Sequence, residues 1–371
     1  MFNRSLESRT FELLRFPLIF LVVLIHCQDV GDVPLESGQF LYNAIKFGFS
    51  SVFTIGAVPC FFFISGYFFF AKFTHFSILE YWKVLKKKTK TLLIPYISWI
   101  ILAFILSLLF NVVLQKTEMS LWQYSLYKIR EMDGWHMFWD YSQWGGTNKN
   151  WLGSPQIMTG PYGGPLWFLR DLIVLTCLSP FILWYLRGTK LLGALILQFC
   201  FISGIWPNIS GFTVVAVSYF TLGGYFSLYK ISPIAVLNKM QPYTYIACFL
   251  LAIWYYMLWG RSTVLGNIIY PFFVITSVIS IITMAAYAAN KGFKVSNRLT
   301  SCSFFVYLMH TIFSIPISRL LVNKILPQNI LVVALLRYIL LIMFVICISV
   351  GCYMLLKRFF PKSLIVLSGG R

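Results

Sequence analysis

The chain has 371 residues, of which 59% are hydrophobic and only 11% are charged, and its mean hydropathy is +0.78. Soluble domains carry about 25% charged residues, so this composition excludes a soluble globular enzyme and a disordered or fibrous chain. The net charge of +19 would point to nucleic acid in a soluble protein. Here the basic residues separate long apolar runs, which indicates a membrane protein whose surroundings are the lipid bilayer, with no nucleic acid partner.

Ten apolar segments approach the length of about 20 residues that a membrane-spanning helix needs. The sequence therefore predicts an all-α fold, a polytopic bundle of about ten transmembrane helices that forms a single domain over residues 1–371. No small-residue cleavage site follows the first segment, so we expect it to be retained. The predicted spans are 11–28, 47–72, 91–114, 166–186, 190–206, 211–229, 242–260, 264–289, 299–323 and 329–356.

The cysteine pattern gives no sign of cross-linking or metal binding. All eight cysteines fall within the apolar runs or at their ends, and no CxxC pair occurs. We therefore expect neither a disulfide framework nor a metal site.

Lysine and arginine residues set the expected orientation, because they are enriched on the cytoplasmic side of membrane proteins. If the N-terminus is cytoplasmic, 20 basic residues fall on the inner side and 8 on the outer side, and seven of the 11 acidic residues fall outside. This asymmetry predicts ten spans with both termini in the cytoplasm.

One long loop, about 115–165, is predicted to face outward, and it is rich in tryptophan and tyrosine. Loops of this length are usually functional or disordered, and this one is too aromatic for disorder. It either forms a surface that stacks on sugar rings or lies as an aromatic belt at the membrane interface. The candidate substrate-binding side chains are Trp139, Trp144 and, at the start of the next span, Trp167.

Ionisable side chains inside the apolar spans are few, and such groups are costly at membrane depth and tend to be functional. Arg15 and His26 share the first span. They are eleven positions apart, which is about 16 Å of rise and nearly three turns, so the two side chains lie on nearly the same helix face. A histidine near a helix end is also often only a hydrogen-bonded interfacial residue.

Two further spans carry polar candidates. Arg170 and Asp171 lie near the outer end of the fourth span, where neighbouring residues point about 100° apart. We therefore expect no direct pair between them, and at least one of them to face a cavity. His310 lies mid-way along the ninth span, with Tyr307 one turn earlier; it is either a second polar site residue or a core histidine bonded to a carbonyl.

Five lysines precede the third span, in the segment that begins at Tyr81. Anchoring at the inner face and contact with anionic lipid explain such a run. The functional alternative is a phosphate-binding patch in which Lys87 and Lys90, three residues apart, act with Arg15. The cofactor-binding candidates are Arg15, Lys86, Lys87, Lys88 and Lys90.

Six segments together resemble integral-membrane acyltransferase family 3, and they occur in family order across nearly the whole chain. The first resembles the family's signature of an arginine, ten residues and a histidine, matched by Arg15 and His26. The basic segment departs from the family pattern, because lysines replace its R-x-x-R arginines and lack their bidentate fork. The six segments are LRFPLIFLVVLIHC, PCFFFISGYFFF, KKKTKTLLIPY, PLWFLRDLIVL, YFTLGGYFSLY and SFFVYLMHTIF.

The resemblance implies an O-acetyltransferase of the bacterial inner (plasma) membrane. It would move an acyl group, usually acetyl, from cytoplasmic acetyl-CoA or another acyl-CoA to a hydroxyl of an extracytoplasmic or lipid-linked glycan. No appended hydrolase-like domain accompanies the spans, so we expect the membrane domain to complete the transfer itself. The phosphates of the donor suit a basic inner patch, and the acceptor would arrive from the outer side.

Within this reading, His26 acts as general base on the acceptor hydroxyl, or alternatively as a transient acyl-imidazole. Asp29 or Asp171 would orient His26. The thioester oxyanion would be stabilised by Arg170, Tyr307 or His310. Two other classes stay open: a transporter or flippase of a lipid-linked saccharide, and a non-catalytic membrane partner of a glycan-assembly complex, for which His26→Ala would leave function intact.

Overall fold

The computed structural model describes residues 4–27, 35, 37–71, 77–113, 119–131, 134–145, 157–259, 264–327 and 329–370. The described chain is almost entirely helical, and all ten predicted segments are helical over most of their length. This confirms the all-α prediction. The elements of the first half are α1 Arg4–His26, α2 Gln39–Phe47, η1 Gly48–Val52, α3 Ala57–Phe70, α4 Ile78–Lys88, η2 Thr89–Leu93, α5 Ile94–Val113, α6 Leu121–Glu131, α7 His136–Trp139, β1 Ser142–Trp144 and β2 Met158–Gly160.

The second half continues the bundle without further strands among its described residues. Three of the short segments, η1, η2 and η4, are π-helical turns, and η3 is a 3₁₀ turn. The remaining elements are η3 Gly164–Leu166, α8 Trp167–Cys177, α9 Ser179–Ser203, α10 Val214–Leu228, α11 Pro233–Asn238, α12 Tyr243–Met257, α13 Val264–Asn290, α14 Asn297–Met309, η4 His310–Ser314, α15 Ile315–Ile325, α16 Leu331–Phe359 and α17 Pro361–Ser368.

Six helical stretches of the described chain are long and apolar enough to cross a membrane. Two shorter apolar helices, α10 and α12, match further predicted spans. These apolar helices are those of an integral membrane protein. The six stretches are Gln39–Phe70, Ile78–Asn111, Ser179–Ser203, Val264–Asn290, Asn297–Ile325 and Leu331–Phe359.

The predicted starts of the second and third spans are wrong. The helix that contains the third span starts at Ile78, not at 91, so the five lysines that precede the predicted span lie on α4 and η2. The second span likewise starts at Gln39. By contrast, the expected break between the fourth and fifth spans is confirmed as a kink in α9, where Lys190 has φ 53° and ψ −131°.

Helices α3 and α10 pack with their backbones in contact, which requires glycine on both. A Cβ added to Gly66 would lie 2.0 Å from the Phe220 carbonyl oxygen, and one added to Gly223 would lie 2.1 Å from the Phe63 carbonyl oxygen. Small residues at crossing points are how membrane helices approach closely. The glycines of the second and sixth spans therefore fix the pair that supports one side of α1.

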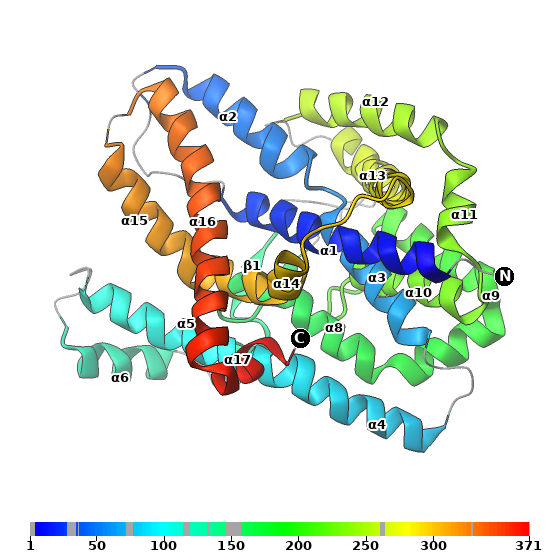
Figure 1. Cartoon of the computed structure of the whole chain (residues 1–371), viewed down its shortest axis with the longest axis horizontal. Helices are drawn as coiled ribbons and strands as arrows, with labels where there is room; N and C mark the ends of the chain where they lie inside the picture. The colour runs from blue at the N-terminus through cyan, green and yellow to red at the C-terminus, as the bar shows by residue number, and fades with distance from the viewer. Residues whose placement is uncertain are drawn as a thin grey trace.

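Helix α1 lies in the middle of the bundle, with α3 and α10 on one side and α14 and α16 on the other (Figure 1). It packs against α13, α14 and α3. Its Phe11 is fully buried and meets Tyr67 of α3 edge-on, with ring centroids 5.2 Å apart. The helix that carries Arg15 and His26 is thus held by elements from both halves of the chain.

The segment after α5, called the outer segment after the side of the membrane predicted for it, is folded over its described residues rather than being a simple loop. Strands β1 and β2 form an antiparallel pair in which Gln143 lies opposite Thr159. The Tyr162 amide donates to the Met137 carbonyl over 2.8 Å, and the Tyr162 hydroxyl donates to Ser107 Oγ of α5 over 2.5 Å. Burial raises the pKa of the Tyr162 phenol, which keeps it a donor. The first bond joins two parts of the segment, and the second attaches it to α5.

Candidate functional site

His26 and His310 meet inside the bundle. Their ring centroids are 5.2 Å apart and the rings are tilted by 52°. His26 ends α1 and is partly exposed, whereas His310 begins η4 and is fully buried. The packing of α1 against α14 brings the two together. Both were candidates from the sequence, and the structure brings them into ring contact.

The backbone fixes the hydrogen position on His310. Its Nδ1 lies 2.5 Å from the Tyr307 carbonyl oxygen. Since a carbonyl can only accept, Nδ1 carries the hydrogen and donates, and Nε2 of the neutral ring holds a lone pair. Nε2 is buried and has no hydrogen-bond partner among the described residues. A buried acceptor without a partner calls for an explanation, and a catalytic role is one of them.

His310 also opens a π-helical turn, His310–Ser314. Single π turns inside α-helices occur frequently at functional sites, because the extra residue redirects the side chains that follow. The turn is braced by a 2.7 Å hydrogen bond between the hydroxyls of Ser314 and Ser349 on α16. The irregular backbone therefore lies where the two histidines meet.

Tyr307 lies beside the histidine pair, with its ring centroid 6.1 Å from that of His310. Its hydroxyl donates to the Pro165 carbonyl over 2.7 Å, and Phe168 packs edge-on against its ring at 5.7 Å. Trp167, the neighbour of Phe168, faces Phe62 of α3 at 6.2 Å. The start of α8 thus forms one wall next to the histidines.

Arg170 and Asp171 form a direct buried ion pair, contrary to the expectation from their adjacency. Arg170 Nη2 and Nε donate to Asp171 Oδ1 over 3.0 and 3.1 Å. The arginine side chain is long enough to curl back, so the 100° between neighbouring Cβ directions does not keep them apart. The other Asp171 oxygen accepts from the Thr213 hydroxyl over 2.7 Å.

The remaining Arg170 donors hold the outer segment. Nη2 donates to the Thr159 carbonyl over 3.0 Å, and Nη1 donates to the Thr159 hydroxyl and the Trp139 carbonyl. All five N–H groups of the guanidinium are therefore engaged. This network ties β2 and α7 to the start of α8, which supports a positioning role for Arg170.

The two loop tryptophans named as candidates have different surroundings. The Trp139 ring lies 5.5 Å from the Arg170 guanidinium and stacks on Trp135 at 5.5 Å and 22°. Trp144 on β1 is partly exposed, and its ring lies against Gly160. Trp135 is 64% exposed, so the Trp135–Trp139 pair offers an open aromatic face on the predicted outer side.

Arg15 lies on α1 about 16 Å from His26, and its side chain is exposed while Leu14 and Leu18 beside it are buried. Of the lysines, Lys86, Lys87 and Lys90 are exposed, and Lys88 lies 5.6 Å from the Phe69 ring of α3. Helix α4 packs against α8, whereas α1 packs against α13, α14 and α3. The joint action of Arg15 and the lysines on one phosphate stays a proposal.

Asp29, a candidate partner of His26, lies outside the described residues. Among the described residues, no group of three or more His, Cys, Asp and Glu side chains is placed to hold a metal ion.

The structure contains a pocket, on the predicted inner side, that the sequence did not predict. Arg298 of α14 and Lys357 and Arg358 of α16 line it. In the sequence these three residues counted only toward the cytoplasmic excess of positive charge. Their convergence depends on how α14 packs against α16, which no local pattern encodes.

Comparison with known proteins bears directly on this site. A family model described as an acyltransferase domain, that of acyltransferase family 3, matches residues 9–354. The match spans Arg15, His26, Arg170, Tyr307 and His310, and it confirms the resemblance drawn from the six segments. No curated protein and no solved structure matches the chain.

Proposed function

The chain belongs to acyltransferase family 3 and is a membrane acyltransferase, and from this premise we propose that it transfers an acyl group, acetyl in particular, from a cytoplasmic acyl-CoA to a hydroxyl of an extracytoplasmic or lipid-linked glycan. The observation that carries the proposal is the contact between His26 and His310 at 5.2 Å. Two imidazoles in contact inside an apolar bundle are suited to moving a proton.

In the proposed reaction, His26 removes the proton from the acceptor hydroxyl as its oxygen attacks the thioester carbonyl. The tetrahedral intermediate collapses with cleavage of the carbon–sulfur bond, and the proton passes from His26 to the departing thiolate. The products are the O-acyl ester and free coenzyme A, so atoms and charge balance. A transient acyl group on the His26 imidazole is the alternative course.

His310 is proposed to orient His26 and to stabilise its protonated form. The support is its fixed tautomer, with Nδ1 donating to the Tyr307 carbonyl and the Nε2 lone pair without a protein partner. A lone pair is the group that an N–H of His26 would donate to. Tyr307, whose hydroxyl is already bonded to Pro165, positions the segment, as Arg170 and Asp171 do through their pair and its links to Thr159 and Thr213.

The two substrates are proposed to approach from opposite sides. Arg15 and the lysines of α4 and η2 supply positive charge for the phosphates of the donor on the cytoplasmic side. The Trp135–Trp139 pair and Trp144 supply aromatic faces for sugar rings on the outer side, with Trp167 nearer the histidines. The bilayer in question is the inner (plasma) membrane of a bacterium, with both chain termini in the cytoplasm.

The test uses purified protein in lipid nanodiscs with acetyl-CoA and glycan extracted from the cell envelope of the producing strain. Release of free thiol that requires both the protein and the glycan would support the proposal. A saccharide transporter would leave acetyl-CoA intact, and a non-catalytic partner would show no dependence on His26. His136→Ala is the matched control, because His136 is an exposed residue of α7 and pairs with Asp140.

A further inference from the structure

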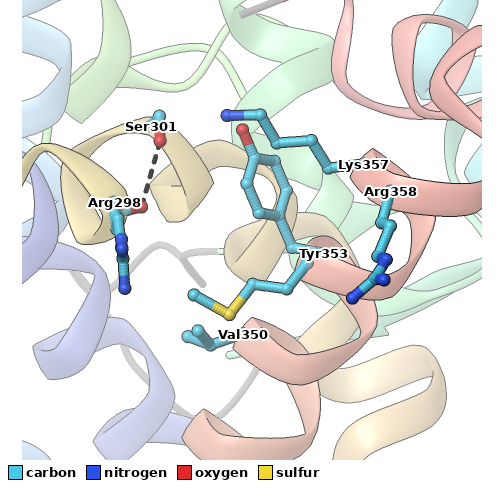
Figure 2. Close-up of a pocket in the computed structure, with 7 residues that line it drawn as sticks. Arg298, Ser301, Val350, Tyr353, Lys357 and Arg358 are labelled. Atoms are coloured by element: carbon cyan, nitrogen blue, oxygen red, sulfur yellow. Dashed lines mark hydrogen bonds between the residues drawn. The ribbon is translucent and has the colours of Figure 1, made fainter.

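A pocket of about 240 Å³ opens between the N-terminal end of α14 and the C-terminal part of α16. Figure 2 shows Arg298 on α14 facing Tyr353, Lys357 and Arg358 of α16 across this space. The buried ring of Tyr353 lies against Phe305 of α14 at 5.8 Å. An aromatic ring therefore lines the pocket, and its three charged lining residues are all cations.

These three cations have no carboxylate within ion-pair distance among the described residues. Lys357 lies 5.9 Å from the Tyr353 ring and Arg358 lies 5.4 Å from the Phe359 ring, so their neighbours are aromatic rather than acidic. Within the part of the chain that the structure describes, no acidic side chain thus balances the positive charge of the pocket. An anion with more than one negative charge is the ligand that such a site favours.

The end of α14 adds to this preference for an anion. Its N-cap residue, Ser296, makes no side-chain hydrogen bond to the first turn. The N–H groups of a first turn carry partial positive charge and bind phosphate readily. Arg298 lies in that turn and Ser301 directly follows it, and both residues line the pocket.

The depth of the pocket matches that of Arg15. Arg298 precedes His310 by twelve residues, about 18 Å along helix, and Arg15 precedes His26 by eleven, about 16 Å. The histidines are in contact and α14 packs beside the middle of α1 (Figure 1). Both arginines therefore lie a similar distance from the histidine pair, toward the predicted cytoplasmic face.

The short helix α17 places the pocket and the lysine patch at the same end of the bundle. It follows Arg358 closely and packs against α5 and α16. A Cβ on Gly369, just after α17, would lie 2.6 Å from the Thr91 carbonyl oxygen in η2, next to Lys90. The helix that follows the pocket residues of α16 thus contacts the segment that carries Lys90.

We infer that the Arg298–Lys357–Arg358 pocket binds the phosphate groups of the acyl-CoA donor and sets how far its thioester reaches toward His26. This inference rests on the proposed function. It assigns the anchoring of the donor to α14 and α16, with the lysines of α4 and η2 as a more exposed attracting surface. The phosphate of an anionic lipid headgroup has the same chemistry and is the source that the experiment must separate.

The experiment measures binding of coenzyme A and of pantetheine, which has no phosphate, to protein in nanodiscs of neutral lipid by isothermal titration calorimetry. We expect Arg298→Gln, Lys357→Gln and Arg358→Gln each to weaken coenzyme A binding about tenfold, without changing pantetheine binding. Arg298→Lys should retain most of the affinity. Lys239→Gln, an exposed cation on the same predicted side, should bind like wild type.

Three results would overturn the inference. Unchanged coenzyme A binding in all three glutamine variants would remove the pocket from the donor site and leave the proposed function standing. Loss of bound phosphatidylglycerol in native mass spectrometry, with coenzyme A affinity unchanged, would make it a lipid site. Absence of coenzyme A binding by the wild-type protein would remove the inference and the proposed function together. Melting temperature and size-exclusion profile establish that each variant is folded, and Arg298→Lys covers the case in which Arg298→Gln is not.

Discussion

The imidazole rings of His26 and His310 lie 5.2 Å apart, although the two residues come from opposite ends of the chain. Because α1 and α14 pack together, the contact joins the arginine–histidine helix of the first span to the π turn of the ninth. The proposed chemistry depends on this pair, and the two histidines have different expected contributions.

Removing His26 should abolish transfer, whereas removing His310 should weaken it. A positioned general base contributes about 10²- to 10⁴-fold, so we expect His26→Ala to lower acyl transfer by that range. His310→Ala should cost less, and His310→Asn, which retains a polar group, should recover part of the loss. The measurement is glycan-dependent thiol release from acetyl-CoA, with His136→Ala expected to match wild type. Full activity of His26→Ala would contradict the assignment.

Arg170 should act on structure more than on chemistry, because its five donors are bonded to Asp171, Thr159 and Trp139. Breaking a buried ion pair by removing one partner costs about 3–5 kcal/mol. We expect Arg170→Ala to lower the melting temperature in detergent and to speed protease cleavage of the outer segment. Arg130→Ala, an exposed residue of α6, is the control. Unchanged melting and cleavage would show that Arg170 does not tie the segment down.

The contact between α3 and α10 should not tolerate a methyl group. Gly66→Ala and Gly223→Ala would place Cβ atoms 2.0 and 2.1 Å from carbonyl oxygens of the partner helix, so the helices must separate. We expect a low yield of monodisperse protein for both. Gly351→Ala is the matched control on α16, where nothing lies within 4 Å of an added Cβ. Because alanine favours helix over glycine by about 1 kcal/mol, this control should be neutral or stabilising.

The lysines of the third span should act through attraction at long range. Lys87 and Lys90 are exposed, and exposed charges contribute about 0.2–1 kcal/mol each. We expect Lys87→Gln with Lys90→Gln to raise the KM for acetyl-CoA about 2- to 30-fold at low salt, with kcat unchanged. The effect should shrink as ionic strength rises. A fall in membrane-inserted protein, with KM unchanged, would instead favour anchoring as their role.

Hydropathy was sufficient to predict the helical architecture, because each span must satisfy its own backbone hydrogen bonds within the membrane. Hydropathy misplaced the starts of the second and third spans. The helix of the third span, for example, begins at Ile78, before the apolar run. Local spacing placed Arg15 relative to His26, which share one helix. It gave no distance from His26 to His310, because that distance is set by packing between helices.

The Arg170–Asp171 pair shows a different limit of sequence reasoning. Helix geometry fixes Cβ directions, but the path of a long side chain is decided by its partners, here Thr159, Trp139 and Thr213. The same applies to Arg298, Lys357 and Arg358, which look like ordinary cytoplasmic anchors until α14 and α16 are brought together. Sequence identified the charges, and only the fold shows which of them converge.

The most direct test of the proposed acyl transfer is the amount of alkali-labile acetyl ester on envelope glycan. It is measured by mass spectrometry in cells that make the wild-type protein, His26→Ala or Arg15→Ala at equal membrane levels. The account predicts that both variants lose the ester while the glycan still reaches the surface. Persistence of the ester in the His26→Ala cells would contradict the proposed base, and loss of the glycan itself from the surface would indicate transport instead of acyl transfer.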